Sequence, residues 1–347
     1  MRHIATPAVC LCAIIGTAAP GDDTAQRAEE AAAILAAART ALGGDAALSA
    51  IKSFTATGRT RRLQGENLVP IEFEMACELP DKFVRRDEIP AQVSGPTTRG
   101  FNGDGLIQLP PPPPRPAPPA GAPRGGPPPG RSAPLPPARG GAPEGPGHAA
   151  GPPKFQPPKS DPLNAIKQDF VRLTLGMFAA SFEAYPMTFL RIGQAQAPEG
   201  MADVIEARGP EGSNFVLRLF VHGQSHLPIM VGWQMPASNV IVTVPGQAKP
   251  TALPPGTVVV EGPPVPAADA SQEEVAAFKR TVADLRRTAQ ATLVEHRFYY
   301  GEYQKVGDVQ FPFRLRRAIG ADTIEETNFD EFRINPRIDP RKFEVVR

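Results

Sequence analysis

One short segment contains the residue types that hydrolases and metalloproteins use. Gly223-Gln224-Ser225-His226-Leu227 resembles a nucleophile elbow for three residues, but Leu227 stands where that turn needs a glycine. His222 and His226 flank the segment, yet a catalytic zinc takes three protein ligands and no third His or carboxylate lies nearby in the sequence. The segment therefore predicts a hairpin loop, and a Ser225/His226 hydrolase is the least favoured alternative.

Charged side chains on predicted strands are candidates for acid–base chemistry. They are Glu72, Glu74 and Glu78 on one strand, and Arg314, Arg316 and Arg317 opposite Glu325 and Glu326 on a later pair. Like charges on a solvated strand face need no raised pKa, and opposite charges on neighbouring strands form a surface ladder. We therefore expect both groups to lie on a solvated face of a sheet without a catalytic role.

Two further motifs are weak. Asn102-Gly103-Asp104-Gly105 has the oxygen-bearing residues of a calcium loop but lacks the later ligands and the closing glutamate. Asn-Gly and Asp-Gly are strong hairpin signals, so a turn is predicted. His296 shares a strand with Phe298 and Tyr300, which predicts a core or edge residue with satisfied hydrogen bonds. No catalytic residue, metal ion or cofactor is expected.

The N-terminus is typical of a secretory signal. Residues 1–19 begin with Arg2, continue through a short apolar run and end in small residues. This run is shorter than the ~20 residues of a membrane span. Cys10 and Cys12 raise the alternative of a lipid anchor, but the residues around them suit lipid attachment poorly. We expect export to the periplasm, with cleavage near Ala18 or Ala19.

The mature chain keeps a single cysteine, Cys77, on the apolar side of a strand. It therefore has no partner for an internal disulfide, and it behaves as a small hydrophobe. The formal net charge of +1 creates no positive field that would attract a phosphate backbone. This excludes an electrostatic nucleic-acid binder.

The 43 prolines are concentrated in two stretches. Residues 110–158 contain almost no aliphatic side chains, so they cannot bury enough apolar area to offset the entropy of ordering. They are predicted to be a disordered or polyproline II insertion. Residues 247–268 form a second Pro-rich loop, which contains three consecutive valines from Val258. The sheet pattern resumes after each stretch, so residues 20–347 are predicted to form one interrupted domain.

Three helices are predicted from apolar periodicity and capping residues. The first spans about residues 25–42 and ends at Gly43. The second begins at Asp161-Pro162, and the third at Ser271 with a capping box to Glu274. Their apolar stripes are Ala28, Ala31, Leu35, Ala38 and Leu42; Leu163, Ile166, Phe170 and Leu173; and Val275, Phe278, Val282 and Leu285.

The rest of the chain alternates apolar and polar residues with a period of two, which indicates half-exposed antiparallel strands. We count roughly ten such strands from this pattern. A sheet of this length curls, and the three helices are expected to cover its apolar concave face. The predicted class is α+β.

The apolar strand faces are rich in aromatic and methionine side chains. These are Phe73, Met75, Leu217, Leu219, Trp233, Met235, Phe311 and Phe313. One interpretation is a plain core filled by the helices. The other is a hydrophobic cavity in which these eight side chains contact a ligand, because Met and Phe adapt to an irregular acyl chain. The helices around Leu35 and Phe170 would then gate the cavity.

Several motifs together resemble the periplasmic lipoprotein-carrier family, the LolA/LolB-like outer-membrane lipoprotein-sorting proteins. They are Ala41-Leu42-Gly43-Gly44, Ile51-Lys52-Ser53, Leu79-Pro80-Asp81-Lys82 with Arg85, Gly100-Phe101-Asn102-Gly103-Asp104-Gly105, Leu227-Pro228, Gly307-Asp308-Val309-Gln310-Phe311-Pro312, and Ile334-Asn335 with Asp339 and Phe343. These motifs cover the chain outside the Pro-rich stretches. Leu106, where relatives often have an aromatic residue, and the insertion at 110–158 depart from the family pattern.

The resemblance implies an unclosed antiparallel β-half-barrel wrapped around lid helices, whose cavity receives lipid or lipoprotein acyl chains in the periplasm. It implies a monomeric, non-enzymatic carrier, with an outer-membrane or envelope protein as a further partner. Because one scaffold serves several functions, the alternative is an envelope interaction or stress-sensor module whose Pro-rich arm binds a partner.

Overall fold

The computed structural model describes residues 20–65, 67–90, 95–111, 161–197, 200–246 and 253–345. The predicted signal, 1–19, and nearly all of the predicted insertion, 110–158, lie outside these residues. The helices are α1 (Pro20–Ala41), α2 (Asp45–Ala50), α3 (Pro162–Phe178) and α4 (Gln272–Gln290), with a 3-10 turn η1 (Pro340–Phe343). The strands are β1 (Ser53–Gln64), β2 (Asn67–Glu78), β3 (Lys82–Glu88), β4 (Thr97–Asn102), β5 (Gly105–Leu109), β6 (Thr188–Ala197), β7 (Gly200–Arg208), β8 (Val216–His222), β9 (Pro228–Pro236), β10 (Asn239–Thr243), β11 (Thr257–Glu261), β12 (Leu293–Val306), β13 (Val309–Ile319) and β14 (Asp322–Ile334).

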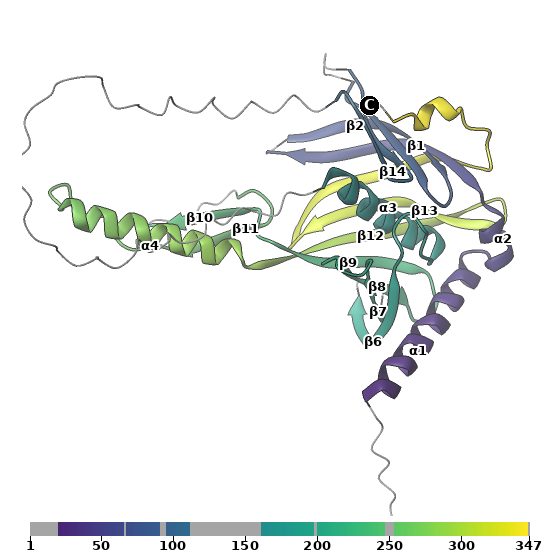
Figure 1. Ribbon diagram of the computed structural model, residues 1–347, viewed down its shortest axis with the longest axis horizontal. Helices are drawn as coiled ribbons and strands as arrows, with labels where there is room; N and C mark the ends of the chain where they lie inside the picture. Colours follow the sequence, from purple (N-terminus) through teal and green to yellow (C-terminus); the bar gives the residue numbers. More distant parts are fainter. Residues whose placement is uncertain are drawn as a thin grey trace, which may run out of the picture.

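Twelve of the described strands form one sheet in the order β5-β4-β3-β2-β1-β14-β13-β12-β9-β8-β7-β6. Neighbouring strands are antiparallel throughout. Strands β5 and β6 are its two edges, so the sheet is not closed. Figure 1 shows α3 lying across the middle of the sheet. The predicted α+β class with an unclosed antiparallel half-barrel is confirmed.

The burial pattern of β1 shows why these residues form strands of a half-exposed sheet. Every second residue from Phe54 to Thr60 is buried, and the residues between them face outward or are half-exposed. A strand places successive side chains on opposite faces, so this alternation separates an inner face from a solvated one. Strand β1 also pairs with β14, beginning at Phe54 opposite Ile334. The first and the last strand of the described sequence are therefore neighbours within the sheet.

Helix α3 has two different halves. The Asp161 side chain accepts a hydrogen bond from the Leu163 amide, which confirms the predicted cap. From Phe170 to Phe178 every residue is buried, and the Phe178 ring lies 5.7 Å from that of Phe311. The N-terminal half, by contrast, has exposed and half-buried residues only. One half of the helix is therefore anchored in the core, and the other half borders open space.

Helix α1 runs along the β6 edge of the sheet (Figure 1). The Arg27 Nε donates to the carbonyl of Arg191 in β6, 2.9 Å away, and Arg39 Nη1 donates to the Phe178 carbonyl at 3.0 Å. The predicted stripe is buried from Ala31 to Leu42, but Ala28 is exposed. This helix supports the edge of the sheet.

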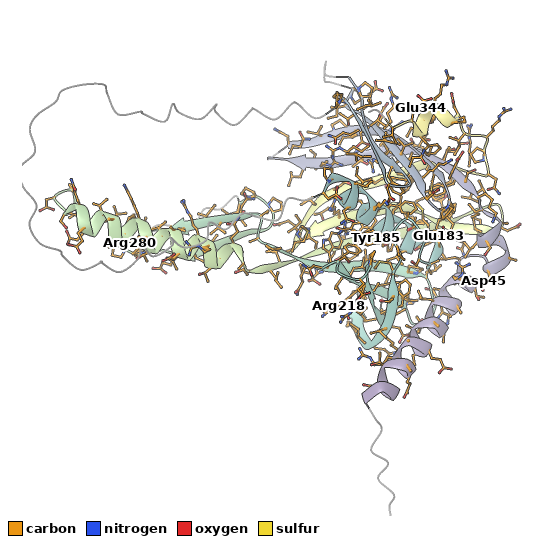
Figure 2. All side chains as sticks on the ribbon, in the orientation of Figure 1. Asp45, Glu183, Tyr185, Arg218, Arg280 and Glu344 are labelled. Carbon is orange, nitrogen blue, oxygen red and sulfur yellow. The ribbon has the colours of Figure 1, made fainter. Side chains whose placement is uncertain are left out.

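The expectation that α4 covers the concave face is wrong. Its capping box at Ser271 and Glu274 is present, but the helix packs on β10 and β11. Figure 1 shows this unit projecting from the large sheet as an arm, and Figure 2 labels Arg280 on its helix. Because β9 and β12 pair with each other, the segment between them is excluded from the sheet. Helix α4 therefore packs on local partners, β10 and β11, of which β11 lies in the predicted loop 247–268.

The pairing of β10 with β11 is parallel, which corrects the expectation that all strands outside the helices are antiparallel. The segment has the three valines that the sequence showed, in register with Val240, Ile241 and Val242. A short β-branched run suits a strand of either orientation. Its direction is set by the chain around it and is not encoded in the run.

The close packing of α3 against Tyr300 of β12 requires a glycine at position 176. A Cβ there would lie against the ring of Tyr300 at a distance far below normal contact. Tyr300 is 2 % exposed, and its hydroxyl donates to the Arg172 carbonyl, so the ring has no room to move. We predict that Gly176→Ala destabilises the protein by about 1–3 kcal/mol through overpacking, measured by chemical denaturation.

Helix propensity alone predicts that Gly176→Ala stabilises the protein, because Ala is more favourable than Gly inside a helix by about 1 kcal/mol. A stabilised Gly176→Ala variant would therefore contradict the close packing of α3 on Tyr300. The matched control is Gly176→Ala combined with Tyr300→Leu. In that background the penalty for the added methyl group is expected to shrink.

Candidate functional site

A cavity of about 530 Å³ lies between the N-terminal half of α3 and the inner face of the sheet. Its floor is formed by β1 to β5 and β12 to β14, and its roof by the first turns of α3. The apolar lining residues are Met75, Phe83, Leu106, Pro162, Ala165, Ile166, Leu173, Phe298 and Leu315. The charged ones are Arg62, Arg85, Arg99, Arg172, Arg317, Asp87, Asp169 and Glu325. The lining of the site thus combines nine apolar side chains with five arginines.

The charged strand residues are on the same face as the aromatic core. Arg85 is two residues from Phe83, Arg99 two residues from Phe101, and Arg317 two residues from Leu315 on β13. Because side chains on a strand alternate between faces, these arginines must point inward with their apolar neighbours. The inner face therefore changes from apolar to charged along the strands.

Three arginines of the cavity form ion pairs. Arg62 Nε lies 2.6 Å from Glu325, and Arg85 Nε lies 2.6 Å from Asp87. Arg172 Nη1 lies 2.7 Å from Asp169, whose side chain is 58 % exposed. These pairs use all three lining carboxylates. Among the described residues, no ion pair is formed by the remaining two lining arginines, Arg99 and Arg317. The lining therefore carries an excess of positive charge.

Arg172 is the most buried of these arginines, with 8 % of its surface exposed. Its guanidinium carbon lies 4.2 Å from the ring centroid of Trp233 and 5.0 Å from that of Phe215. A guanidinium over an aromatic face gains a cation–π attraction. Burial nevertheless lowers the pKa of Arg172, and the positive charge of Arg317 acts in the same direction.

Trp233 joins Arg172 to two further polar side chains. The imidazole of His296 stacks on the indole with 5.4 Å between ring centroids, and the guanidinium carbon of Arg317 lies 5.7 Å from the indole centroid. Burial lowers the pKa of His296, with smaller contributions from Arg317 and Arg172. Arg172, Arg317, Trp233 and His296 are called the arginine–tryptophan cluster below.

Each member of the arginine–tryptophan cluster has a buried nitrogen without a hydrogen-bond partner among the described residues. These atoms are Arg172 Nε, Arg317 Nε, Trp233 Nε1 and His296 Nδ1. Two expectations are therefore wrong: His296 is not satisfied, and Arg317 is not part of a solvated ladder. The register does place Arg317 opposite Glu325, but both side chains line the cavity.

The eight predicted cavity residues are distributed over different environments. Only Met75 lines the cavity. Phe73, Leu217, Leu219 and Phe311 are buried among core side chains, Trp233 is buried beside Arg172, and Phe313 is partly buried against the core. Met235 is 44 % exposed, because β9 runs past the core there toward the arm. That these residues contact a ligand stays a prediction, and the geometry favours it for Met75 alone.

The other candidate motifs have structural roles. The segment 222–226 forms the β8–β9 hairpin, as predicted, with His222 Nδ1 3.0 Å from the Ser225 hydroxyl. Glu78 pairs with Lys82 at 2.8 Å and Glu74 with Lys342 on the solvated side of β2. In the described part of the chain, no group of three or more His, Cys, Asp or Glu residues is placed to hold a metal ion.

Two more predicted features are confirmed. Residues 102–105 form the turn of the β4–β5 hairpin, and Asp104 there binds Lys167 of α3 at 2.9 Å. Cys77 is a buried free cysteine. Burial raises the pKa of its thiol far above the ordinary value, so it remains an uncharged hydrophobe.

No family model matches this chain, and no curated protein matches it. Among solved structures it is similar to a LolA superfamily protein from Nitrosomonas europaea, with 11 % identity, coverage of 90 % of this chain and 97 % of the other, and a TM-score of 0.43. It is also similar to a DUF1329 family protein from Desulfovibrio piger, with 6 % identity, 93 % and 97 % coverage and a TM-score of 0.39. A third match is a domain provisionally named an outer membrane lipoprotein-sorting protein, from Vibrio parahaemolyticus, with 8 % identity, 93 % and 96 % coverage and a TM-score of 0.39.

We predict that Arg317→Gln raises the pKa of His296, because it removes a nearby positive charge that disfavours the imidazolium. The measurement is an NMR titration of the His296 ring. Arg316→Gln, which removes the same charge from the opposite face of β13, is the matched control and is expected to leave that pKa unchanged. Equal pKa values in both variants and the wild type would contradict the placement of Arg317 beside His296.

The same shift has a consequence for stability. The folded state holds the pKa of His296 below the unfolded value of about 6.5. The stability that the protein owes to a neutral His296 is therefore fully present above about pH 6.5, and it is lost as pH falls through the lowered pKa. Acid destabilisation in this window is expected to be smaller in Arg317→Gln than in Arg316→Gln.

Proposed function

We propose that this chain is a periplasmic, non-enzymatic carrier that binds a lipid or lipoprotein acyl chain in the cavity between α3 and the sheet. The observation that carries this proposal is the cavity itself, which has nine apolar lining residues beside its charged ones and a volume of about 530 Å³ beneath a half-anchored helix. This volume lies within the range of about 300–1,000 Å³ that small-molecule pockets occupy.

Burial of an acyl chain supplies the affinity in this proposal. Each methylene removed from water contributes about 0.8 kcal/mol, and the nine apolar lining residues provide the surface that receives it. Met75 and Leu173 lie on opposite walls, one on the sheet and one on the helix. A chain between them contacts apolar side chains on both sides.

The first turns of α3 are suited to gating the cavity. Phe170 is fixed between the rings of Phe83 and Phe101, with centroids 5.5 and 5.4 Å away. The turns before it have exposed or half-buried residues only, and Lys167 connects them to Asp104 in the β4–β5 turn. Phe170 thus acts as the anchor, and the turns around Ala165 and Ile166 as the part that moves.

The proposal includes a periplasmic location and a role without catalysis. The predicted signal at 1–19 directs export to the periplasm, where a soluble carrier shields acyl chains from water. None of the described helices is long and apolar enough to cross a membrane. The carrier is expected to be monomeric and to deliver its cargo to an outer-membrane or envelope protein.

The arm formed by β10, β11 and α4 favours a second candidate function, an envelope interaction or sensor module. The arm projects from the sheet (Figure 1), and most side chains of α4 are exposed. If this function is correct, deletion of residues 239–290, with a short linker from β9 to β12, abolishes partner binding and leaves acyl binding intact.

The carrier proposal is tested by filling the cavity from its roof. Ala165 lines the cavity and is exposed, so Ala165→Phe adds bulk there without disturbing the core. We expect the variant to fold normally and to bind a radiolabelled fatty acid at least about tenfold more weakly, a loss of about 1.4 kcal/mol.

Ala276→Phe, at an exposed position on α4, makes the same change outside the cavity and is expected to bind as the wild type does. Native mass spectrometry of the wild type purified from a bacterial periplasm should also detect a lipid or an acylated peptide. A wild type that carries no lipid and refuses added fatty acid would contradict the carrier function.

A further inference from the structure

The arginine–tryptophan cluster is incomplete as a set of hydrogen bonds. Arg172 and Trp233 are 8 % and 5 % exposed, and each has a buried nitrogen without a partner among the described residues. Arg317 Nε and His296 Nδ1 are also buried and also lack a hydrogen-bond partner among the described residues. A buried donor that gives up water and gains no partner loses free energy. The Arg172, Arg317 and Trp233 nitrogens can only donate, so these three atoms indicate a missing acceptor.

The charge of the surroundings defines what that acceptor is. The cavity lining contains five arginines and three carboxylates, and each carboxylate is already paired with one arginine. Arg85 and Arg99 also stand directly opposite each other on β3 and β4. Like charges in that position repel across a sheet. An anion in the cavity would relieve this repulsion and the excess positive charge together.

The cluster adjoins the apolar part of the cavity. Arg172 is followed by Leu173 on α3, and Arg317 follows Leu315 on the inner face of β13, and all four residues line the same cavity. Phe298 of β12, which also lines it, is two residues from His296 on the same face of its strand. A molecule with an acidic group and an apolar tail can thus satisfy both parts at once.

We propose that Arg172 and Arg317, which line the cavity and pack beside Trp233, form a subsite for the carboxylate or phosphate oxyanion of an amphipathic acid whose tail fills the cavity. The inference rests on the proposed carrier function and narrows its cargo to acidic lipids. Arginine suits this role because its planar guanidinium donates two parallel hydrogen bonds to one oxyanion.

The test compares three probes that separate the acid from the tail. Oleate has both, oleyl alcohol has the tail alone, and inorganic phosphate is the anion alone. The purified full-length mature protein is titrated with each probe, below the micellar range for the two lipids. The readout is intrinsic tryptophan fluorescence, because Trp233 is the single tryptophan of the chain and lies within the cluster. Radiolabelled ligand measures binding independently of fluorescence.

The wild type is expected to bind oleate on the order of tenfold more tightly than oleyl alcohol, since hydrogen bonds to charged groups are the strong ones. Arg317→Gln should abolish this preference while leaving binding of the alcohol unchanged. Arg317→Lys should retain part of it. Arg316→Gln, with its side chain over Tyr299 on the outer face, is the matched control and should behave as the wild type does.

The outcomes distinguish the subsite from the carrier function. Equal affinities for oleate and oleyl alcohol, unchanged in Arg317→Gln, overturn the anion subsite and leave the carrier intact. Phosphate binding that depends on Arg317, without binding of either lipid, supports the oxyanion subsite as one for a free anion and overturns the acyl-carrier function. No binding of any probe overturns both.

Discussion

The position of α3 on β12 determines the geometry of the candidate site. Gly176 allows the ring of Tyr300 to lie directly against the helix, and the Tyr300 hydroxyl bonds the carbonyl of Arg172. This contact fixes both the rotation and the height of α3 over the sheet. Arg172 is thereby held above Trp233, and the turns that precede it are left over the cavity. The same contact therefore contributes both to the packing of α3 in the core and to the position of Arg172 at the site.

The cavity under α3 places the guanidinium groups of Arg172 and Arg317 beside the core, where an ordinary core would have no charge. Guanidinium groups are costly to bury unless they are paired, and the partner of Arg172 is a largely exposed Asp169. The indole of Trp233 offsets part of this cost. Arg317 has no such carboxylate among the described residues. The proposed anion would supply the partner that Arg317 lacks, and the apolar walls beside it would receive the tail.

The sequence predicted local structure better than the site. Caps at Asp161 and Ser271 and period-two strands were readable, because capping and alternation depend on nearby residues. The partner of α4 was not, since an amphipathic stripe shows that a helix packs without showing against what. The parity that Arg317 shares with Phe311 and Leu315 indicates the inner face, but its neighbours Arg314 and Arg316 point outward and favour the ladder interpretation for all three. Alternation alone does not distinguish core from cavity lining, and most of the large apolar residues form the core beside the cavity.

The central claim is that the space between α3 and the inner sheet face holds the tail of an amphipathic acid. A crystal structure with a fatty acid brominated near its methyl end tests it most directly, because anomalous scattering locates the bromine independently of the protein phases. The account predicts a bromine peak within the cavity, near Met75 and Leu173, with the carboxylate toward Arg317. A bromine on the outer face or along the arm, with the cavity holding only water, would contradict it.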